Sequence, residues 1–198
     1  SRVNSLRAAR ALGAIDAFIA ALTLQHGPHG SDVTAEQAAT LAAAEEAVED
    51  VRTIVVPVYD EFSGVRAVEL ACRLAEAQAT AIVIAAVQVV HRARALDNPP
   101  PELVTRTERL LRLTGAAASR HGVPFETIRQ PARSYQDGVI ESARHTGAQL
   151  IVLPNPAIAG GLGRGEDVLR EILVRAPCEV LIDRGGRVAL APMTPGGE

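Results

Sequence analysis

Lysine is absent from this chain, in which all twenty basic residues are arginine. A Walker-type phosphate-binding loop needs a Lys on the phosphates, and a Schiff-base enzyme needs a Lys amine. A receiver-type phosphorylation domain relies on a Lys as well. The sequence therefore excludes these three chemistries.

Cysteines and long apolar runs are also scarce. Cys72 and Cys178 lie in apolar surroundings without metal-ligand spacing, so we expect both to be buried packing residues in a reducing compartment. No apolar run reaches the roughly 18 residues of a membrane-spanning helix, because Arg10 and Asp16 interrupt the longest candidate, residues 8–24. The five histidines are scattered, and we expect no metal site. The net charge of −3 gives no reason to expect a nucleic acid as partner.

Residues 1–50 differ in composition from the rest, with three Arg against seven Asp or Glu. Their first part carries apolar residues at three- and four-residue spacing: Leu12, Ile15, Ile19 and Leu22. This spacing predicts an amphipathic helix. A Gly-Pro-His-Gly-Ser breaker at residues 27–31 separates it from a second Ala-rich stretch. We expect a helical extension or linker.

From residue 51 onward, β-rich runs alternate with helical segments. The expected strands cover residues 53–58, 81–87, 125–129, 150–153 and 180–182. The expected helices cover 64–77, 134–145, 166–175 and a long segment that follows the Pro-rich loop 97–101 and runs to about residue 120. Continuous apolar strands separated by helices predict an α/β fold with a parallel sheet that is covered on both faces. We place this domain at residues 51–184 and expect the Gly/Pro-rich segment 185–198 to be a flexible tail.

Several motifs resemble the universal stress protein family. In the first half, Ile54-Val-Val-Pro-Val58 is followed by Ala67-Val-Glu-Leu-Ala71; in the second half, Gly147-Ala-Gln-Leu-Ile-Val-Leu153 is followed by Ala176-Pro-Cys178. The resemblance covers about residues 52–184. It implies a doubly wound, Rossmann-like five-stranded sheet of order 3-2-1-4-5, a homodimer formed through the last strand, and a cytoplasmic location.

Three further motifs are most similar to the cytoplasmic domains fused behind membrane transporters within this family. They are Asn98-Pro-Pro-Pro-Glu102, Gly122-Val-Pro124 and Arg129-Gln-Pro-Ala-Arg133. This similarity implies a membrane transporter portion as a partner and a place at the cytosolic face of the membrane.

The ATP-binding pattern of the family is altered in this chain. Members that bind ATP have an Asp after the Pro-Val that ends the first strand, where this chain has Tyr59 followed by Asp60. They also have Gly-x-x-Gly, nine residues, then Gly-Ser or Gly-Thr. Here Pro154-Asn-Pro-Ala157 and eight residues precede Glu166-Asp167. The prolines remove N–H donors from the phosphate position, and the carboxylates already neutralise the helix dipole. We therefore expect no ATP binding of the usual kind.

A glycine-rich loop, Gly160-Gly-Leu-Gly-Arg-Gly165, follows the fourth strand. Its backbone amides and Arg164 could hold a smaller phosphate, or its glycines could serve only a surface connection. The candidate binding residues come from this loop and from the ends of three expected strands: Val58, Tyr59, Asp60, Val87, Pro154, Gly160, Gly161, Gly163, Arg164 and Gly165.

Other polar groups near the expected strand ends allow two interpretations each. Residues 91–94 (His-Arg-Ala-Arg) follow the second strand, where doubly wound sheets bind ligands, and would either meet an acidic ligand or form a solvated loop. Ser63 beside Asp60 could be a nucleophile, although a helix-capping role explains it better. Arg129 and Arg133 would support a loop, form surface pairs or touch a ligand.

The sequence thus predicts a non-catalytic regulatory and dimerisation domain. The alternative is a nucleotide-sensing domain that binds ATP, AMP or a cyclic dinucleotide through the altered loop. A third hypothesis, a nucleotide hydrolase using Asp60 and Mg²⁺, lacks a catalytic constellation in the sequence.

Overall fold

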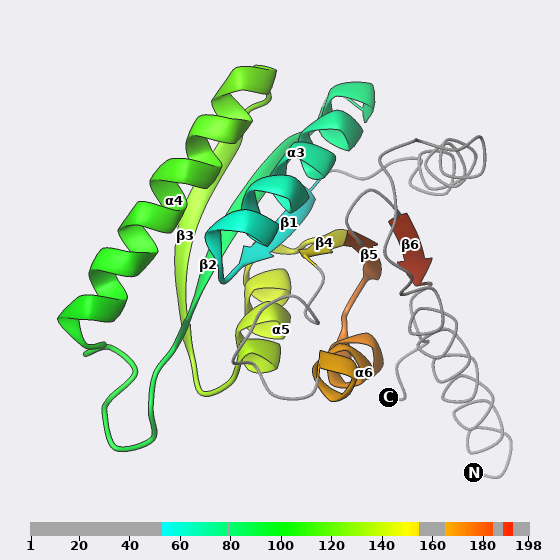
Figure 1. Cartoon of the computed structure of the whole chain (residues 1–198). Helices are drawn as coiled ribbons and strands as arrows, with labels where there is room; N and C mark the ends of the chain where they lie inside the picture. Colours follow the sequence, from blue (N-terminus) through cyan, green and yellow to red (C-terminus); the bar gives the residue numbers. More distant parts are fainter. Residues whose placement is uncertain (1–52, 79, 155–164, 184–187, 192–198) are drawn as a thin grey trace, which may run out of the picture.

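The domain is a six-stranded sheet between two layers of helices (Figure 1). The computed structural model describes residues 53–78, 80–154, 165–183 and 188–191. The strands are β1 (Thr53–Val58), β2 (Ala81–Val89), β3 (Phe125–Ala132), β4 (Leu150–Pro154), β5 (Glu179–Asp183) and β6 (Val188–Ala191). The helices are α3 (Glu61–Gln78), α4 (Pro101–His121), α5 (Tyr135–Thr146) and α6 (Gly165–Arg175). The expected extension of residues 1–50 lies outside the described residues.

The strand order is β3-β2-β1-β4-β5-β6, and the first five strands are parallel. β1 lies in the centre, where Ile54 pairs with Ile82 of β2 on one side and with Leu150 of β4 on the other. The chain adds β2 and β3 on one side of β1, then crosses over and adds β4 and β5 on the other. This confirms the expected five-stranded parallel sheet of order 3-2-1-4-5.

The expectation of a flexible tail over residues 185–198 was wrong for residues 188–191. These four residues form β6, which runs antiparallel to β5 and pairs Asp183 with Val188 and Val180 with Ala191. The Gly and Pro content of the segment favoured a tail, but Val-Ala-Leu-Ala is a short apolar run. The unpaired N–H and C=O groups at the edge of β5 offer such a run a partner.

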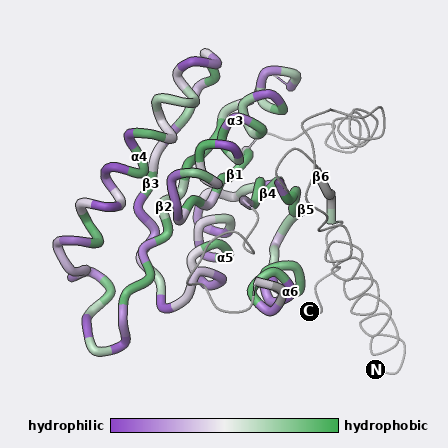
Figure 2. The backbone as a smooth tube through the Cα atoms, in the orientation of Figure 1, coloured by the Kyte–Doolittle hydropathy of each residue, from purple (hydrophilic) through white to green (hydrophobic). Residues whose placement is uncertain are grey.

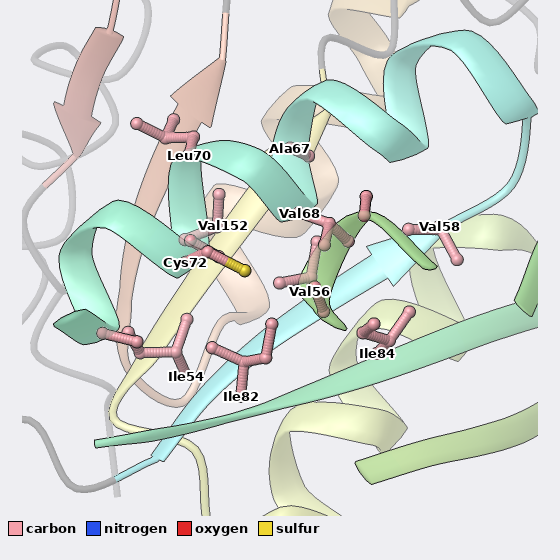
Figure 3. Packing of buried hydrophobic residues seen from close by; sticks show 14 of the residues in the cluster. Ile54, Val56, Val58, Ala67, Val68, Leu70, Cys72, Ile82, Ile84 and Val152 are labelled. Atoms are coloured by element: carbon pink, nitrogen blue, oxygen red, sulfur yellow. The ribbon is translucent and has the colours of Figure 1, made fainter. Parts of the chain in front are cut away.

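Each face of the sheet is covered by a pair of helices, α3 and α4 on one side and α5 and α6 on the other (Figure 1). Side chains alternate between the faces, so that Ile54, Val56 and Val58 pack under α3 (Figure 3) while Val55 packs on the α5 side. Burial on both faces explains why the central strands β1 and β4 are almost entirely apolar, whereas the edge strand β3 is largely exposed and carries polar residues. Figure 2 shows the most hydrophobic stretches of the backbone tube gathered in the central strands.

The element boundaries follow local chemistry. α4 begins at Pro101, whose missing N–H is not needed in the first helical turn, and is followed by the capping residue Gly122 with φ 69°. α5 is followed by Gly147 with φ 61°, and both glycines take the left-handed conformation that closes a helix. β3 extends to Ala132, beyond the expected end at residue 129, because an edge strand tolerates Pro131 and continues to pair with β2.

Candidate functional site

The predicted site residues of the strands meet at the carboxyl edge of the sheet. Val58, Val87 and Pro154 are the last or nearly last residues of β1, β2 and β4, and all three are buried. The order of the sheet reverses between β1 and β4, where doubly wound sheets form a ligand crevice. Of the glycine-rich loop, residues 160–164 lie outside the described residues, and Gly165 begins α6. The structure therefore describes the strand half of the predicted site.

Asp60 caps the N-terminus of α3. The backbone N–H of Ser63 donates to Asp60 Oδ1 over 2.9 Å, and the Ser63 hydroxyl donates to Asp60 Oδ2. The backbone N–H of Gly64 also donates to the carbonyl of Asp60, over 3.1 Å. A carboxylate at this position satisfies N–H groups that have no partner inside the helix. Both carboxylate oxygens of Asp60 are thus engaged within the chain, and Ser63 belongs to the cap.

Tyr59 is held between two side chains that the sequence analysis did not single out. Its ring centroid lies 5.8 Å from that of Tyr135 in an edge-to-face arrangement. The guanidinium carbon of Arg106 lies 4.9 Å from the Tyr59 ring centroid, and Arg106 Nη2 donates to the Tyr59 carbonyl over 3.2 Å. An edge-to-face pair of rings and a cation over a ring face are both attractive arrangements. Together they fill the space beside the end of β1.

Tyr135, the first residue of α5, contacts the end of β1 from the α5 side of the sheet. Its side chain is buried, and its hydroxyl donates to the carbonyl of Pro57 over 3.2 Å. Burial raises the pKa of Tyr135 far above its ordinary value, and the charge of Asp60 adds to the rise, so the phenol remains protonated and keeps donating. One sequence signal could have found it: Tyr135 begins the helix after the third strand, at the same sheet edge as Tyr59. Arg106, inside α4, gives no such signal.

The end of β5 contributes a carboxylate that the sequence analysis also missed. Asp183 is 7% exposed and pairs in register with Pro154. Its Oδ2 lies 3.6 Å from Arg66 Nε on α3. An anion at this end of β4 would meet a carboxylate and, at Pro154, a residue without an N–H donor. This end of the edge is therefore a poor place for a phosphate.

The loop after β2 presents positive charge at the same edge. Arg133 Nη1 donates to the carbonyls of Val90, His91 and Arg94 over 3.3, 2.9 and 2.9 Å, which fixes the loop. The side chains of Arg92 and Arg94 are exposed. Arg133 thus supports the loop rather than a ligand.

Arg129 also has a structural role, because it forms a surface ion pair with Glu108 over 3.1 Å. Exposed pairs of this kind contribute little to stability. Of the interpretations considered for Arg129, the structure therefore supports the surface ion pair.

A cavity of about 510 Å³ lies at the opposite, amino edge of the sheet, away from the predicted site residues that the structure describes. Its lining includes Thr53, Ala81, Pro124, Phe125, Glu126 and His145. Within the described part of the chain, no group of three or more His, Cys, Asp or Glu side chains could hold a metal ion. None of the described helices is long and apolar enough to cross a membrane.

Comparisons with known proteins agree with this architecture. The model of the universal stress protein family matches residues 50–184. A solved universal stress protein in complex with cAMP is 25% identical, with a TM-score of 0.54, and the match covers 68% of this chain and 97% of that one. The universal stress protein from Archaeoglobus fulgidus, also solved with dAMP, is 17% identical with a TM-score of 0.53, covering 67% of this chain and 98% of that one. No curated protein sequence matches the chain.

Proposed function

The chain belongs to the universal stress protein family, and on this premise we propose that it is a non-catalytic regulatory domain that does not hold ATP in the family's usual way. The observation that carries the proposal is the engagement of Asp60, whose two carboxylate oxygens both accept hydrogen bonds from Ser63. A nucleoside hydroxyl that bound this carboxylate would have to compete with the first turn of α3.

The residues around Asp60 make that competition unfavourable. Disturbing a helix cap costs about 1 kcal/mol, and separating an aromatic pair such as Tyr59 and Tyr135 costs about 1 kcal/mol more. The sum of about 2 kcal/mol corresponds to a roughly 30-fold larger dissociation constant. A nucleotide would also find Pro154 and the buried Asp183 carboxylate at the neighbouring strand ends.

Calorimetric titration of the purified chain with ATP, AMP, cAMP and cyclic di-AMP, with and without Mg²⁺, tests this proposal. We expect no heat of binding for ATP up to about millimolar concentration, where the free energy of binding would be only about −4 kcal/mol. Micromolar ATP binding that Asp60→Asn weakens would contradict the proposal. Release of phosphate from ATP that Asp60→Asn abolishes would support the hydrolase hypothesis and contradict the regulatory domain.

A nucleotide-sensing domain for a smaller ligand is the second candidate. It is favoured by the cAMP complex of the 25% identical universal stress protein and by the Arg106 guanidinium beside the Tyr59 ring. A monophosphate carries less charge than ATP, so the carboxylates of this edge oppose it less.

The matched pair Arg106→Ala and Arg112→Ala separates the two candidates. Both arginines lie on the exposed side of α4, but only Arg106 contacts Tyr59. If AMP or cAMP binds at micromolar concentration and Arg106→Ala weakens it about tenfold while Arg112→Ala does not, the sensing function holds. Equal affinities in all three proteins would place any binding elsewhere and contradict it.

For the receiver of the regulatory signal, we propose a membrane transporter portion of a longer protein, on the similarity of residues 98–102 and 122–124 to transporter-fused domains. An antibody against the α/β domain, applied to membrane and soluble fractions of the source cells, tests this. Detection in the membrane fraction at a higher mass than 20.8 kDa is expected. A soluble product of that mass alone would contradict it.

A further inference from the structure

The last strand of the sheet shields β5 from the surroundings. β6 pairs with four of the five residues of β5, from Val180 with Ala191 to Asp183 with Val188. Figure 1 shows β6 as the outermost strand on this side of the sheet. Ala191 is 5% exposed and packs into the cluster beneath α5 and α6. β6 therefore completes the sheet and a part of its core.

Without β6, β5 would be an exposed edge strand that could pair with another chain. Val180, Leu181 and Ile182 are all buried, and the N–H and C=O groups on the outer side of β5 would have no partner. An edge strand that combines apolar side chains with a row of unpaired N–H and C=O groups is a template for pairing with another chain. In a solution of this protein, a second copy offers the same exposed edge, so the available partner for β5 is β5 of that second copy.

The direction of β6 shows which kind of contact it replaces. β6 runs antiparallel to β5. Two copies related by a two-fold axis would also pair their β5 strands antiparallel, because the same patch faces itself in a two-fold contact. β6 thus occupies, within one chain, the position that β5 of a second copy would take.

We propose that β6 is an intramolecular cap of the sheet edge, and that it prevents this chain from dimerising through β5. Removing β6 converts the protein into a dimer that pairs β5 with β5. The complete chain is then monomeric at this edge, in contrast to the homodimer through the last strand that the family resemblance implied.

The length of the connection makes the internal strand the stronger competitor. Only residues 184–187 separate the paired residues Asp183 and Val188. A segment on so short a link has an effective concentration on the order of millimolar. A second copy at roughly 10 µM is about 100-fold more dilute, so β6 excludes it unless β6 is lost or displaced.

Sedimentation velocity on three lengths of the chain tests the proposal. We compare residues 1–198, residues 1–191, which keep β6, and residues 1–183, which lack it. The first two should sediment as monomers from about 10 to 100 µM, well below the effective concentration of the cap, and the third as a dimer. A dimer formed by the complete chain, or a monomer formed by residues 1–183, would overturn the proposal.

A peptide in trans controls for non-specific association of the shortened chain. A synthetic peptide of residues 184–194 should return the 1–183 protein to monomer, because it restores the missing strand. Aggregates of the shortened chain that do not respond to the peptide count against the proposal.

Two proline variants of the complete chain test the same edge without truncation. Successive residues of an antiparallel strand direct their N–H groups alternately toward the partner strand and away from it. One of Ala189→Pro and Leu190→Pro therefore removes a hydrogen bond to β5, and the other removes an outward N–H. Exactly one of the two should dimerise. Monomers in both variants would contradict a competition at this edge.

Charge gives a further check on the register of the dimer. In a β5–β5 pairing centred on Leu181, Glu179 of each copy lies opposite Asp183 of the other, and like charges directly opposite each other destabilise a strand pair. Glu179→Gln in the 1–183 protein should strengthen dimerisation severalfold, whereas Glu171→Gln on α6 should leave it unchanged. Equal effects of both substitutions would overturn β5–β5 pairing.

Discussion

At the scale of single residues, the carboxyl edge of the sheet is governed by side chains that satisfy one another. Asp60 accepts from Ser63, Tyr135 donates to Pro57, and Arg106 contacts both the ring and the carbonyl of Tyr59. Each of these groups would otherwise be free to meet a ligand. The polar groups at this edge therefore stabilise the fold through contacts within the chain.

Asp60→Ala should destabilise the protein by about 1 kcal/mol, because it leaves N–H groups of the first turn of α3 without a partner. Asp60→Asn should retain most of the stability, since Asn caps helices nearly as well. Asp97→Ala, in the exposed loop before α4, is the matched control. Urea denaturation of the three variants measures the effect, and an Asp60→Ala protein as stable as the control would contradict the cap.

Gly138→Ala should be destabilising, by about 1–3 kcal/mol, because overpacking a core strains its neighbours. A Cβ at Gly138 would lie 2.4 Å from Cγ1 of the buried, β-branched Val87. At Gly115 the nearest atom is 3.3 Å away, at the ring edge of Phe125, which is 37% exposed and has room to shift. Gly115→Ala should therefore be neutral or stabilising, since Ala favours helix.

Thermal denaturation compares the two glycine variants, and Val87→Ala in the Gly138→Ala background should recover part of the loss. A Gly138→Ala protein as stable as Gly115→Ala would contradict the close packing. Val87, one of the candidate site residues, thus packs closely against Gly138 of α5.

At the scale of elements, helix caps and interhelical pairs fix the boundaries that apolar periodicity leaves open. The sequence predicted the first helix of the domain from residue 64, but α3 begins at Glu61 because Asp60 caps it. Ser134 caps α5 by accepting from the N–H of Asp137 over 3.1 Å. Apolar periodicity gave the existence and order of the helices, whereas their first turns depend on polar side chains that the pattern does not weigh.

The contact between α5 and α6 should make stability depend on pH in acid. A hydrogen bond from Arg175 to Asp137, 2.8 Å long, and one from Ser134 lower the pKa of Asp137 below its ordinary value of 3.8. A lowered pKa contributes stability that is present above the unfolded value and is lost as the pH falls through the folded value. Both partners are partly exposed, so the contribution is below about 1 kcal/mol.

Asp137→Asn should therefore lower the free energy of unfolding near neutral pH and make no difference below the folded pKa of Asp137. Urea titrations at both pH values measure this difference. Glu141→Gln is the control, since its pairing with Arg144 is long, at 3.9 Å, and exposed on both sides. A difference between Asp137→Asn and the unchanged chain that persists in acid would contradict the mechanism.

At the scale of the whole molecule, the two apolar layers on either side of the sheet determine the fold. The sequence predicted the five parallel strands, because the central ones are apolar on both faces and all five alternate with helical segments, and the family resemblance supplied their order. It did not predict β6, a run of four residues that is stable only against the edge of β5. The contacts of Tyr135 and Arg106 with the end of β1 were also beyond it, since they join residues 47 to 78 positions apart in the chain.

The two cysteines should report on both layers at once. Cys72 lies in the cluster under α3 and Cys178 in the cluster under α6, and both are buried as expected. Burial raises the pKa of Cys72 to about 11 and that of Cys178 to about 12. Both thiols therefore remain protonated and unreactive at about pH 8, since the thiolate is the reactive form.

A thiol reagent should modify neither cysteine in the native protein and both at one common rate in mild urea, if the layers unfold together. Ser119→Cys, on the exposed side of α4, supplies a thiol that should react at once. Because burial raises the pKa of both thiols above the unfolded value of 9.0, the folded state is favoured as long as the thiols stay protonated. This stabilisation is fully present below pH 9 and is lost as the pH rises through the folded pKa values. Rapid native-state labelling of either cysteine would show that its layer opens separately.

The pairing of Tyr59 with Tyr135 has an optical consequence. The chain has no tryptophan and only these two tyrosines, whose ring centroids lie 5.8 Å apart at the carboxyl edge. Nearly all of its intrinsic ultraviolet fluorescence and its near-ultraviolet circular dichroism therefore originate at one place in the molecule. A ligand that contacts these rings at the carboxyl edge should change the tyrosine emission of the native protein, whereas one that binds at the amino edge should leave it unaltered. The unlabelled chain is therefore its own site-specific probe.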